Sequence, residues 1–383
     1  MALRVLWVLE ASGGGAGRHV ADLAPLLLRE GVEVHLAYSP LRLAEPLRSA
    51  LPALARAGVR LFPLPMRRAP HPSDLGALLR LLAYARKAGP FALVHGHSAK
   101  GGALARFLGP LLRVPVIYTP HAPITLSPFL LPWERWLYGL AERTLARFTR
   151  LAVAVSPWER EELLRLGYPE ERVALIPNGV DPSLYPQGAR EAARRSLGLE
   201  GEFAVGFVGR LDLQKRPLLA LEAFAHFLEG GGEGVLLFMG EGPLREEVEA
   251  VVRRRGLGRG VCFVPGKDTR FLMPALDGLL LTSAYEGMPY VLLEAFAAGV
   301  PVVSAPTPGL GEWLGGEGLA LVAEAPTPEA LAAALLQAQQ DPHRRASLRA
   351  RGRAWTEERN LERMFRETLS LYRSLPARSA LAP

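Results

Sequence analysis

The feature that most constrains this chain is a regular alternation of short apolar runs with longer amphipathic segments. The runs are rich in valine and leucine, as in strands buried in a parallel sheet, and the segments between them have the length and periodicity of helices. Seven runs occupy the first half, at residues 3–9, 32–38, 59–64, 91–95, 115–119, 151–156 and 172–177. After a polar stretch that begins at 181, six more follow, at residues 202–209, 234–240, 260–266, 276–283, 301–305 and 318–323. This pattern predicts an α/β protein with two doubly wound domains, residues 1–180 and 181–383.

The composition excludes several other classes of protein. With 49% apolar and 22% charged residues, the chain is unlike a disordered, collagen-like or coiled-coil protein. Its one cysteine, Cys262, excludes an internal disulfide framework, and the apolar run around it predicts a buried, inert thiol. No run approaches the ~20 apolar residues of a membrane-spanning helix. Glu10 and the glycines after it come too early for a signal peptide, so we expect a soluble, cytoplasmic protein.

Charge is distributed unevenly between the two halves. Residues 1–180 contain 22 Lys and Arg against 13 Asp and Glu, a net charge of +9, whereas residues 181–383 contain 23 against 25. A basic half favours an anionic partner such as a phosphate, a nucleic acid or an anionic lipid surface. A genomic bias toward arginine would give the same excess, so charge alone leaves the partner open.

A glycine-rich turn, ASGGGAGRHV (11–20), follows the first predicted strand and opens a helix. In open α/β sheets, ligands bind beyond the carboxyl ends of the strands, and a glycine turn at a helix N-terminus suits an anion. A dinucleotide-binding turn does not fit, because its third glycine would fall at Arg18 and the second strand ends at Tyr38 instead of an acidic residue. A flexible turn without a ligand is the alternative.

Charged residues follow two predicted strands of the second half. Arg210 and Lys215 lie five residues apart in the turn VGRLDLQKRP (208–217), where two cations can clamp a diphosphate. Glu286 follows a later strand, and Glu294 lies eight residues further on, inside an apolar helix where a carboxylate needs a partner. Two carboxylates that flank a helix N-terminus suit a ligand with hydroxyls at both ends and an anion between them. Taken alone, the basic turn fits a solvated loop equally well.

Several motifs, taken in order, resemble one family over nearly the whole chain. They are GGxGRHV near the start, HSAKGGALARFLG (97–109), YTPHAP (118–123), VAVSPWER (153–160), IPNGVD (176–181), VGRLDLQKRP (208–217), MGEGPLREE (239–247) and EGMPYVLLEAFAAGVPVV (286–303). This set resembles the retaining glycosyltransferases of family 4, and the Glu-x7-Glu segment with the Arg…Lys turn is its most specific part. The resemblance implies the GT-B fold, in which two Rossmann-like domains face one another across a cleft.

The resemblance also assigns a role to each domain. Residues 1–180 would form the acceptor-side domain, and residues 181–383 would bind the nucleotide sugar. The last segment, from about residue 358, would be a helix that crosses back to the first domain. Among the catalytic residues that it implies, Arg210 and Lys215 would bind the donor diphosphate and neutralise the leaving group.

The remaining implied residues surround the donor. Glu286 and His121 complete the implied catalytic set: Glu286 would bind hydroxyls of the donor sugar, and His121 would lie beside the sugar near its anomeric carbon. Glu294 would bind the ribose. Backbone amides would contact the phosphates and the acceptor at Gly14, Gly15 and Ala16. Backbone amides would also contact sugar and phosphate oxygens around Met288, Tyr290 and Val291. The nucleobase would lie near Gly266 and Lys267.

The activity that the resemblance implies is transfer from a nucleoside-diphosphate sugar to a hydroxyl of a glycan or glycolipid, by front-face displacement with retention, in polysaccharide or glycolipid assembly. UDP is the favoured nucleotide and GDP the next. No Asp-x-Asp occurs in the chain, so we expect no metal and no cofactor besides the donor. Two departures from the family pattern leave acceptor contacts and donor preference open: Gly17 stands where a glutamate is common, and APTPGLGEW (305–313) replaces a Gly-Gly turn.

The first half holds further candidates. Lys100 is either a contact for an acceptor phosphate or a solvated lysine at a helix start, and the sequence favours neither. His97 ends a predicted strand, and we expect His95 to be structural. The segment 124–150 mixes aromatic side chains with arginines. It predicts either a helix on the anionic inner face of a membrane or an interior helix with one solvated face.

Two other functions compete with a hexosyltransferase-type enzyme. One is a sugar-nucleotide epimerase with the GT-B fold, and the other is a basic protein that binds nucleic acid or an anionic surface. A nucleic-acid-binding protein would interleave exposed aromatics with Lys and Arg, whereas here the special residues gather at strand ends. An inactive sugar-binding scaffold would not need Arg210, Lys215 and the two glutamates together. We therefore predict a glycosyltransferase that does not bind nucleic acid.

Overall fold

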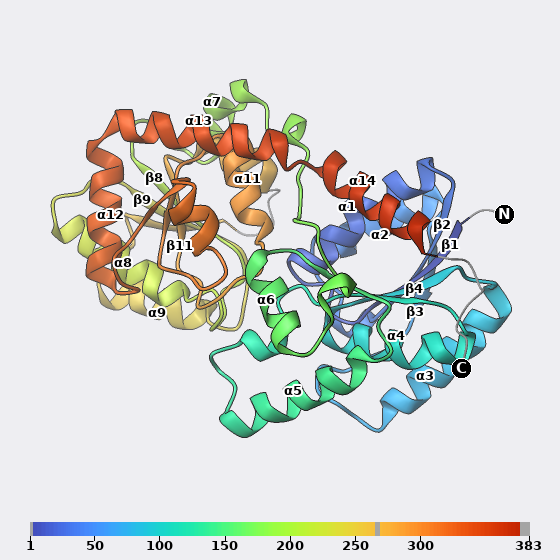
Figure 1. The fold of residues 1–383 in the computed structure, drawn as a ribbon. Helices are drawn as coiled ribbons and strands as arrows, with labels where there is room; N and C mark the ends of the chain where they lie inside the picture. The colour runs from blue at the N-terminus through green and yellow to red at the C-terminus, as the bar shows by residue number, and fades with distance from the viewer. Residues whose placement is uncertain (1–2, 265–268, 376–383) are drawn as a thin grey trace. The chain divides into compact units, whose positions relative to one another are not determined.

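The computed structural model describes residues 3–264 and 269–375, and the chain divides into two compact units. One unit is drawn from Met1–Asn178 and Leu361–Pro383, and the other is Gly179–Asn360. Each unit contains one parallel β-sheet with helices packed on it (Figure 1). No helix within the described ranges is both long and apolar enough to cross a membrane.

The first sheet has seven strands in the order β3-β2-β1-β4-β5-β6-β7. The strands are β1 (Leu3–Leu9), β2 (Val32–Tyr38), β3 (Arg60–Pro63), β4 (Leu93–His97), β5 (Val116–Thr119), β6 (Leu151–Ala154) and β7 (Val173–Leu175). The helices of this unit are α1 (Gly15–Arg29), α2 (Leu47–Ala57), α3 (Ser73–Ala88), α4 (Ser98–Leu112), α5 (Pro132–Ala146), α6 (Pro157–Arg165) and α14 (Leu361–Ser374).

Alternate residues of β1 supply two separate cores. Trp7 and its neighbours at odd positions pack with α1, α2 and α14, whereas Leu6 and Val8 pack with α3 and α4. Because successive side chains of a strand point to opposite faces, an all-apolar strand means that helices cover both faces of the sheet. The continuous run LRVLWVL therefore encodes a central strand.

Helix α14 belongs to the core of the first unit although it lies at the end of the chain. It packs beside α1, as Figure 1 shows with α14 in red and α1 in blue. The Tyr372 hydroxyl accepts a hydrogen bond from Trp7 Nε1 at 2.9 Å and lies 2.6 Å from His95 Nδ1. His95 Nε2 also lies 2.8 Å from Thr119 Oγ1, so this buried histidine is structural, as expected.

The second sheet has six strands in the order β10-β9-β8-β11-β12-β13. The strands are β8 (Ala204–Val208), β9 (Val235–Met239), β10 (Val261–Phe263), β11 (Gly278–Leu281), β12 (Val302–Ser304) and β13 (Ala320–Val322). The helices of this unit are α7 (Arg190–Ser196), α8 (Pro217–Glu229), α9 (Arg245–Arg254), α10 (Thr269–Leu272), α11 (Tyr290–Ala298), α12 (Pro328–Gln340) and α13 (Pro342–Glu358).

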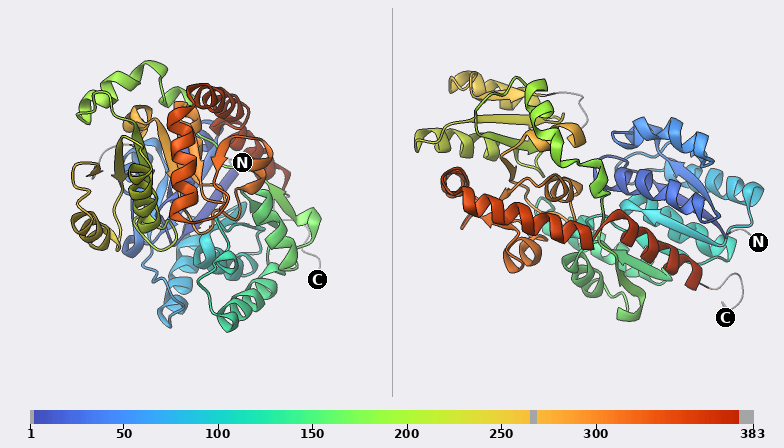
Figure 2. Two further views of the ribbon diagram at one scale, coloured as in Figure 1. Left: turned by 90° about the vertical axis from the view of Figure 1, so that its left-hand side faces the viewer. Right: turned by 90° about the horizontal axis from the view of Figure 1, so that it is seen from above.

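Two details of the second unit follow from packing. The long helix α13 lies against α11 (Figure 2), and Gly352 permits this contact because a Cβ there would lie 2.8 Å from a ring carbon of Phe296. Cys262 is exposed, so the expectation of a buried thiol is wrong. It lies on β10, an edge strand, where Val261 and Phe263 face the core and the residue between them points the other way.

In both sheets the strand order reverses beside the first strand of the unit. The reversal lies between β1 and β4 in the first sheet and between β8 and β11 in the second. Loops that leave neighbouring strands in opposite directions open a crevice at such a switch point, which is where doubly wound folds bind ligands. The side chains at these two switch points are therefore the candidates for function.

Candidate active site

The turn after β8 is shaped by contact with the turn after β9. Gly209 and Gly240 have φ angles of 148° and 150°, and a Cβ on Gly240 would lie 2.0 Å from the carbonyl oxygen of Gly209. The two turns also share backbone hydrogen bonds, including one from Leu211 N–H to the Glu241 carbonyl at 3.0 Å. Glycine is required there because any side chain would push the turns apart. The VGR and MGEG motifs thus position the charged residues that follow.

Asp212 organises the Arg210–Lys215 turn from within. Its carboxylate accepts a hydrogen bond from the backbone N–H of Lys215 at 3.0 Å and pairs with the guanidinium of Arg210. The Arg210 side chain is 56% exposed, so a ligand can reach it. Arg216, in the left-handed conformation with φ 50°, ends the turn and α8 begins at Pro217. The carboxylate therefore fixes the turn and orients Arg210.

Lys215 and Glu286 meet across the switch point of the second sheet. Lys215 Nζ donates to Glu286 Oε1 at 2.5 Å, with the two side chains 20% and 8% exposed. The hydroxyl of Thr282 donates to the Lys215 carbonyl at 2.7 Å, which ties the loops after β8 and β11 together. An ammonium group has three donors, so Lys215 can hold this carboxylate and still bind an anion.

Helix α11 begins four residues after Glu286. It starts at Tyr290 after Pro289, and all nine of its residues are buried, including Glu294 one turn from the start. Met288, Tyr290 and Val291 surround the N-terminus of this helix, where free N–H groups and the helix dipole favour negative charge. The structure thus places Lys215, Glu286 and the start of α11 close together at the switch point of the second sheet. Gly266 and Lys267 lie outside the described residues.

The glycine turn of the first unit is equally constrained. Gly14 precedes α1 with φ 67°, and a Cβ on Gly17 would lie 2.0 Å from the carbonyl oxygen of Ser12. The turn therefore excludes every side chain at residue 17, which explains why glutamate is absent there. Gly15 and Ala16 open the helix, so their amides lie at its positive end.

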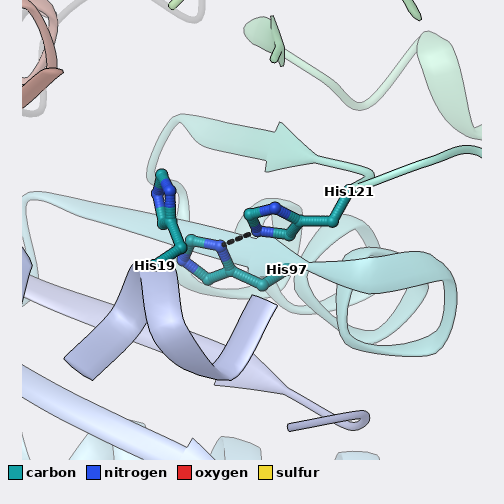
Figure 3. Close-up of side chains that lie close together, drawn as sticks. All are labelled: His19, His97 and His121. Atoms are coloured by element: carbon teal, nitrogen blue, oxygen red, sulfur yellow. Dashed lines mark hydrogen bonds between the residues drawn. The ribbon is translucent and has the colours of Figure 1, made fainter. Parts of the chain in front are cut away.

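Three histidines converge at the switch point of the first sheet (Figure 3). His19 lies on α1, His97 ends β4, and His121 follows β5. One ring nitrogen from each lies within 4.8 Å of the others, and His97 Nδ1 is 3.1 Å from His121 Nε2. Burial lowers the pKa of His19 to about 4 and holds the pKa values of the other two well below the usual range. The three imidazoles are therefore neutral at pH 7.

A buried carboxyl group holds the turn that presents His121. His121 and Ala122 both have positive φ angles, 53° and 71°, which is strained for residues with a side chain. Glu159, in the first turn of α6, accepts hydrogen bonds from the backbone N–H groups of Ala122 at 2.6 Å and Val155 at 3.2 Å. Burial raises the pKa of Glu159 to about 7. The strained turn is thus stabilised from the neighbouring helix.

Lys100 is neither solvated nor free in the first unit. Its ammonium contacts both carboxylate oxygens of Asp74, at 2.9 and 2.8 Å, and the Ala69 carbonyl at 2.6 Å. It lies in the first turn of α4, whose glycines permit close packing: a Cβ on Gly101 would lie 2.4 Å from the Val8 carbonyl. An acceptor phosphate would have to compete with Asp74 for this ammonium.

Sequence reasoning missed three residues of these clusters. Asp212 lies inside the recognised basic turn, His19 lies inside GRHV, and Glu159 lies inside VAVSPWER. A signal was present for His19, because it lies just after the first strand, while His97 ends one later strand and His121 follows the next. Glu159 had no such signal, because a glutamate in the first turn of a helix is ordinarily a solvated cap.

Comparison with known proteins agrees with this geometry. Residues 13–184 match the family described as Glycosyltransferase Family 4, and residues 189–355 match Glycosyl transferases group 1. The chain is 30% identical to the 2-deoxystreptamine glucosyltransferase of Streptomyces kanamyceticus over 271 residues, 67% of this chain and 68% of that one. It is 32% identical to a Bacillus subtilis protein named as glycosyltransferase EpsF, over 56% of this chain but only 57% of that relative's length.

The fold comparison extends over the whole chain. A crystal structure of Anabaena HepE in complex with UDP-glucose superposes with a TM-score of 0.82, at 21% identity, and covers 97% of this chain and 100% of that one. The two Rossmann-like units thus have the GT-B fold. The protein belongs to the group 1 glycosyltransferases and is an enzyme of that class.

Proposed function

We propose that the enzyme transfers a sugar from a nucleoside-diphosphate sugar to a hydroxyl of a glycan or glycolipid, with retention of the anomeric configuration. The observation that carries this proposal is the Lys215–Glu286 pair, 2.5 Å between Nζ and Oε1, at the switch point beside the start of α11. A cation, a carboxylate and a helix N-terminus in this arrangement suit a sugar joined to a diphosphate.

The chemistry follows from the charge that develops. The bond from C1 of the sugar to the donor phosphate breaks, and Lys215, Arg210 and the N-terminus of α11 stabilise the departing diphosphate. A phosphate oxygen takes the proton of the acceptor hydroxyl while the acceptor oxygen bonds to C1 on the same face. Glu286 binds sugar hydroxyls and is not a nucleophile. Because cationic side chains neutralise the leaving group, we infer that the donor requires no metal ion.

The other donor contacts are proposed by position. Glu294 binds the ribose, His121 lies beside the sugar, and the amides at Gly14, Gly15 and Ala16 serve the phosphates and the acceptor. We favour UDP as the nucleotide and GDP as the next candidate; the HepE crystal structure, a fold neighbour, contains UDP-glucose. For the acceptor we propose only the class, a hydroxyl of a glycan or glycolipid. The relative from Streptomyces kanamyceticus is named for a different acceptor, 2-deoxystreptamine.

A titration panel tests this proposal. UDP, GDP, ADP, CMP, NAD and a short DNA duplex would be titrated calorimetrically into the protein, with and without EDTA. One nucleoside diphosphate should bind, unaffected by EDTA and much more weakly in Arg210→Ala or Lys215→Ala. Binding of NAD or DNA alone would contradict the proposal. NMR would detect conversion of a UDP-sugar to its epimer in the absence of any acceptor, and that result would favour the epimerase instead.

We also propose that α5 contacts an anionic membrane surface. Trp133 and Trp136 on this helix are 62% and 66% exposed, and more large apolar side chains beside them are exposed as well: Phe129, Leu131, Leu137, Leu140 and Phe148. The buried residues of the helix, Glu142, Leu145 and Ala146, lie near its C-terminal end, so the part that carries both tryptophans is the exposed part, which supports the membrane contact over an interior helix. Its neighbouring arginines, Arg135, Arg143 and Arg147, give the face a charge that anionic lipid attracts.

Vesicle binding tests the membrane contact. The protein should sediment with vesicles that contain phosphatidylglycerol and remain in solution with phosphatidylcholine vesicles at the same salt concentration. Trp133→Ser with Trp136→Ser should abolish sedimentation, whereas Leu75→Ser, an exposed leucine on α3, serves as the matched control. Equal binding to both vesicle types, or binding unchanged by the tryptophan substitutions, would contradict the proposal.

A further inference from the structure

The histidine cluster of the first unit leaves two buried ring nitrogens without a hydrogen-bond partner among the described residues. These are His97 Nε2 and His121 Nδ1, and His97 is fully buried. Buried polar atoms are ordinarily hydrogen-bonded, so this cluster has hydrogen-bonding capacity that no protein group uses. The donor chemistry proposed above uses only His121 of the three and does not account for His19 or His97.

The hydrogen-bond geometry of the cluster suits a metal better than an anion. Asn178 Oδ1 lies 3.3 Å from His19 Nδ1, and because a carbonyl oxygen only accepts, this ring nitrogen carries the hydrogen and Nε2 carries a lone pair. Two neutral imidazoles carry one ring hydrogen each, so with both hydrogens on the outer nitrogens, His97 Nε2 and His121 Nδ1, the facing nitrogens His97 Nδ1 and His121 Nε2 both present lone pairs. Three imidazoles from three elements thus gather ring nitrogens in one buried place.

The distances are close to those of a tetrahedral metal site. A zinc ion with nitrogen ligands at about 2.0–2.1 Å holds those nitrogens about 3.3 Å apart. His97 Nδ1 and His121 Nε2 are 3.1 Å apart, and one ring nitrogen from each of the three histidines lies within 4.8 Å of the other two. The hydrogen bond from His19 to Asn178 is the outer contact that orients a ligating imidazole.

The backbone fixes the three rings before any ion arrives. His19 is held on α1, and His97 is held at the end of β4 with its ring edge against Trp7, 5.4 Å between centroids. His121 is held by the turn that Glu159 stabilises, and its ring stacks on His97 with 5.4 Å between centroids and 20° between planes. Rings from three elements that converge in this way are preorganised for one small ligand.

We propose that His19, His97 and His121 form a binding site for one soft divalent cation of the zinc type. Imidazole ligands select Zn²⁺, Ni²⁺ or Cu²⁺ over Mg²⁺ and Ca²⁺, which prefer oxygen. The site is distinct from the proposed diphosphate clamp of Arg210 and Lys215, which is cationic. If the proposed role of His121 beside the sugar holds, a cation here withdraws that side chain and slows sugar transfer, a consequence that rests on the proposed function.

Metal titration without any substrate tests the site itself. The tag-free full-length protein, stripped with EDTA and dialysed, would be titrated with Co²⁺ and separately with Zn²⁺. We expect one ion per chain, with the visible absorption of tetrahedral Co²⁺, displaced by Zn²⁺ and not by Mg²⁺. His19→Gln and His97→Gln should each weaken binding at least about tenfold. His343→Gln, which changes an exposed histidine on α13, is the matched control and should bind as the wild type does.

A second measurement needs no variant and covers the case in which His97→Gln does not fold. X-ray absorption at the zinc edge of the loaded wild-type protein counts the imidazole ligands. Three imidazoles would support the site. Fewer than three, the absence of a one-to-one Co²⁺ complex, or unchanged binding in His19→Gln would overturn it. None of these readouts involves sugar transfer, so failure of the glycosyltransferase proposal would leave them unaffected, and their failure would leave that proposal standing.

Discussion

The two units of this protein share one architecture and differ in the chemistry at their switch points. Beside β8 and β11 the loops present an ion pair, an exposed arginine and the start of a buried helix. Beside β1 and β4 the loops present three neutral histidines and a glycine turn. A doubly wound sheet therefore fixes where functional side chains gather but not what they are, because the side chains of the loops vary independently of the sheet topology.

The contrast also shows in how each cluster is supported. In the second unit, Asp212 holds the basic turn through charge-assisted contacts. In the first unit, Glu159 holds the His121 turn through backbone hydrogen bonds, and burial brings its pKa to about 7. One support is a partly exposed ion pair, and the other is a buried carboxyl group whose pKa is about 7. Substitutions in each unit can test whether that difference is real.

Lys215→Ala should have the largest effect, because it removes the cation that we propose for the leaving diphosphate. We expect kcat/KM for sugar transfer to fall about 10²–10³-fold, as for the loss of one electrostatic contact in a transition state. Lys87→Ala, an exposed lysine at the end of α3, should leave the rate unchanged. Steady-state kinetics on both variants, with thermal unfolding to confirm folding, is the measurement. A Lys215→Ala rate within twofold of the wild type would refute the role.

Glu159→Gln should change how stability depends on pH. The folded-state pKa of Glu159, about 7, lies above its ordinary value of 4.5, so the folded protein binds the proton more tightly than the unfolded chain does. Its contribution to stability is thus fully present below pH 4.5 and is lost as pH rises toward 7, by at most about 3 kcal/mol. The free-energy difference between wild type and variant, from urea unfolding at several pH values, should show this slope. Parallel curves would show that the carboxyl group titrates normally.

Gly17→Ala should destabilise the first unit through a backbone clash. The new Cβ would lie 2.0 Å from the Ser12 carbonyl oxygen, so we expect a loss of about 2–3 kcal/mol in the free energy of unfolding. Gly76→Ala on α3 is the matched control, because its Cβ would meet nothing within 4 Å. Alanine is the better helix former, so this variant should gain about 0.5–1 kcal/mol. Equal stabilities for the two variants would disprove the steric argument.

Tyr372→Phe should have the smallest effect. It removes the oxygen that accepts from Trp7 Nε1 and also contacts His95, while the ring of α14 stays in the core. Leaving these buried partners unsatisfied should cost about 1–2 kcal/mol. Thermal unfolding of Tyr372→Phe beside Tyr138→Phe, on the less buried α5, measures the difference. A variant as stable as the wild type would mean that the hydroxyl contributes nothing to holding α14.

Much of the fold could be predicted from periodicity alone. All thirteen predicted strands are present, with ends that differ by up to three residues, and their all-apolar runs reflect burial on both faces of parallel sheets. The chain passes from the first compact unit to the second between Asn178 and Gly179, and the sequence pattern predicts a domain boundary at 180. The exposure of Cys262 was not predictable, because sequence does not show that its strand lies at the edge of the sheet.

The candidate site was predictable only in part. Arg210, Lys215 and Glu286 stand out because charges follow apolar strands, and β8 and β11 are neighbours only because the sheet order reverses there. That Lys215 contacts Glu286 rather than remaining solvated depends on loops far apart in sequence. The same holds for Lys100, which Asp74 engages. Ion pairs between residues far apart in sequence depend on distances in the folded protein, which a local sequence pattern does not predict.

What the sequence determined by itself is the alternation of strands and helices, the glycines at tight turns and the charge of each loop, because these depend on neighbours along the chain. What only the tertiary structure decided is which side chains meet. His19, His97 and His121 come from three separate segments of the chain. Tyr372 is hydrogen-bonded to Trp7 although the two lie near opposite ends of the sequence. Burial then makes the imidazoles neutral, and burial is a property of the packed molecule rather than of any one segment.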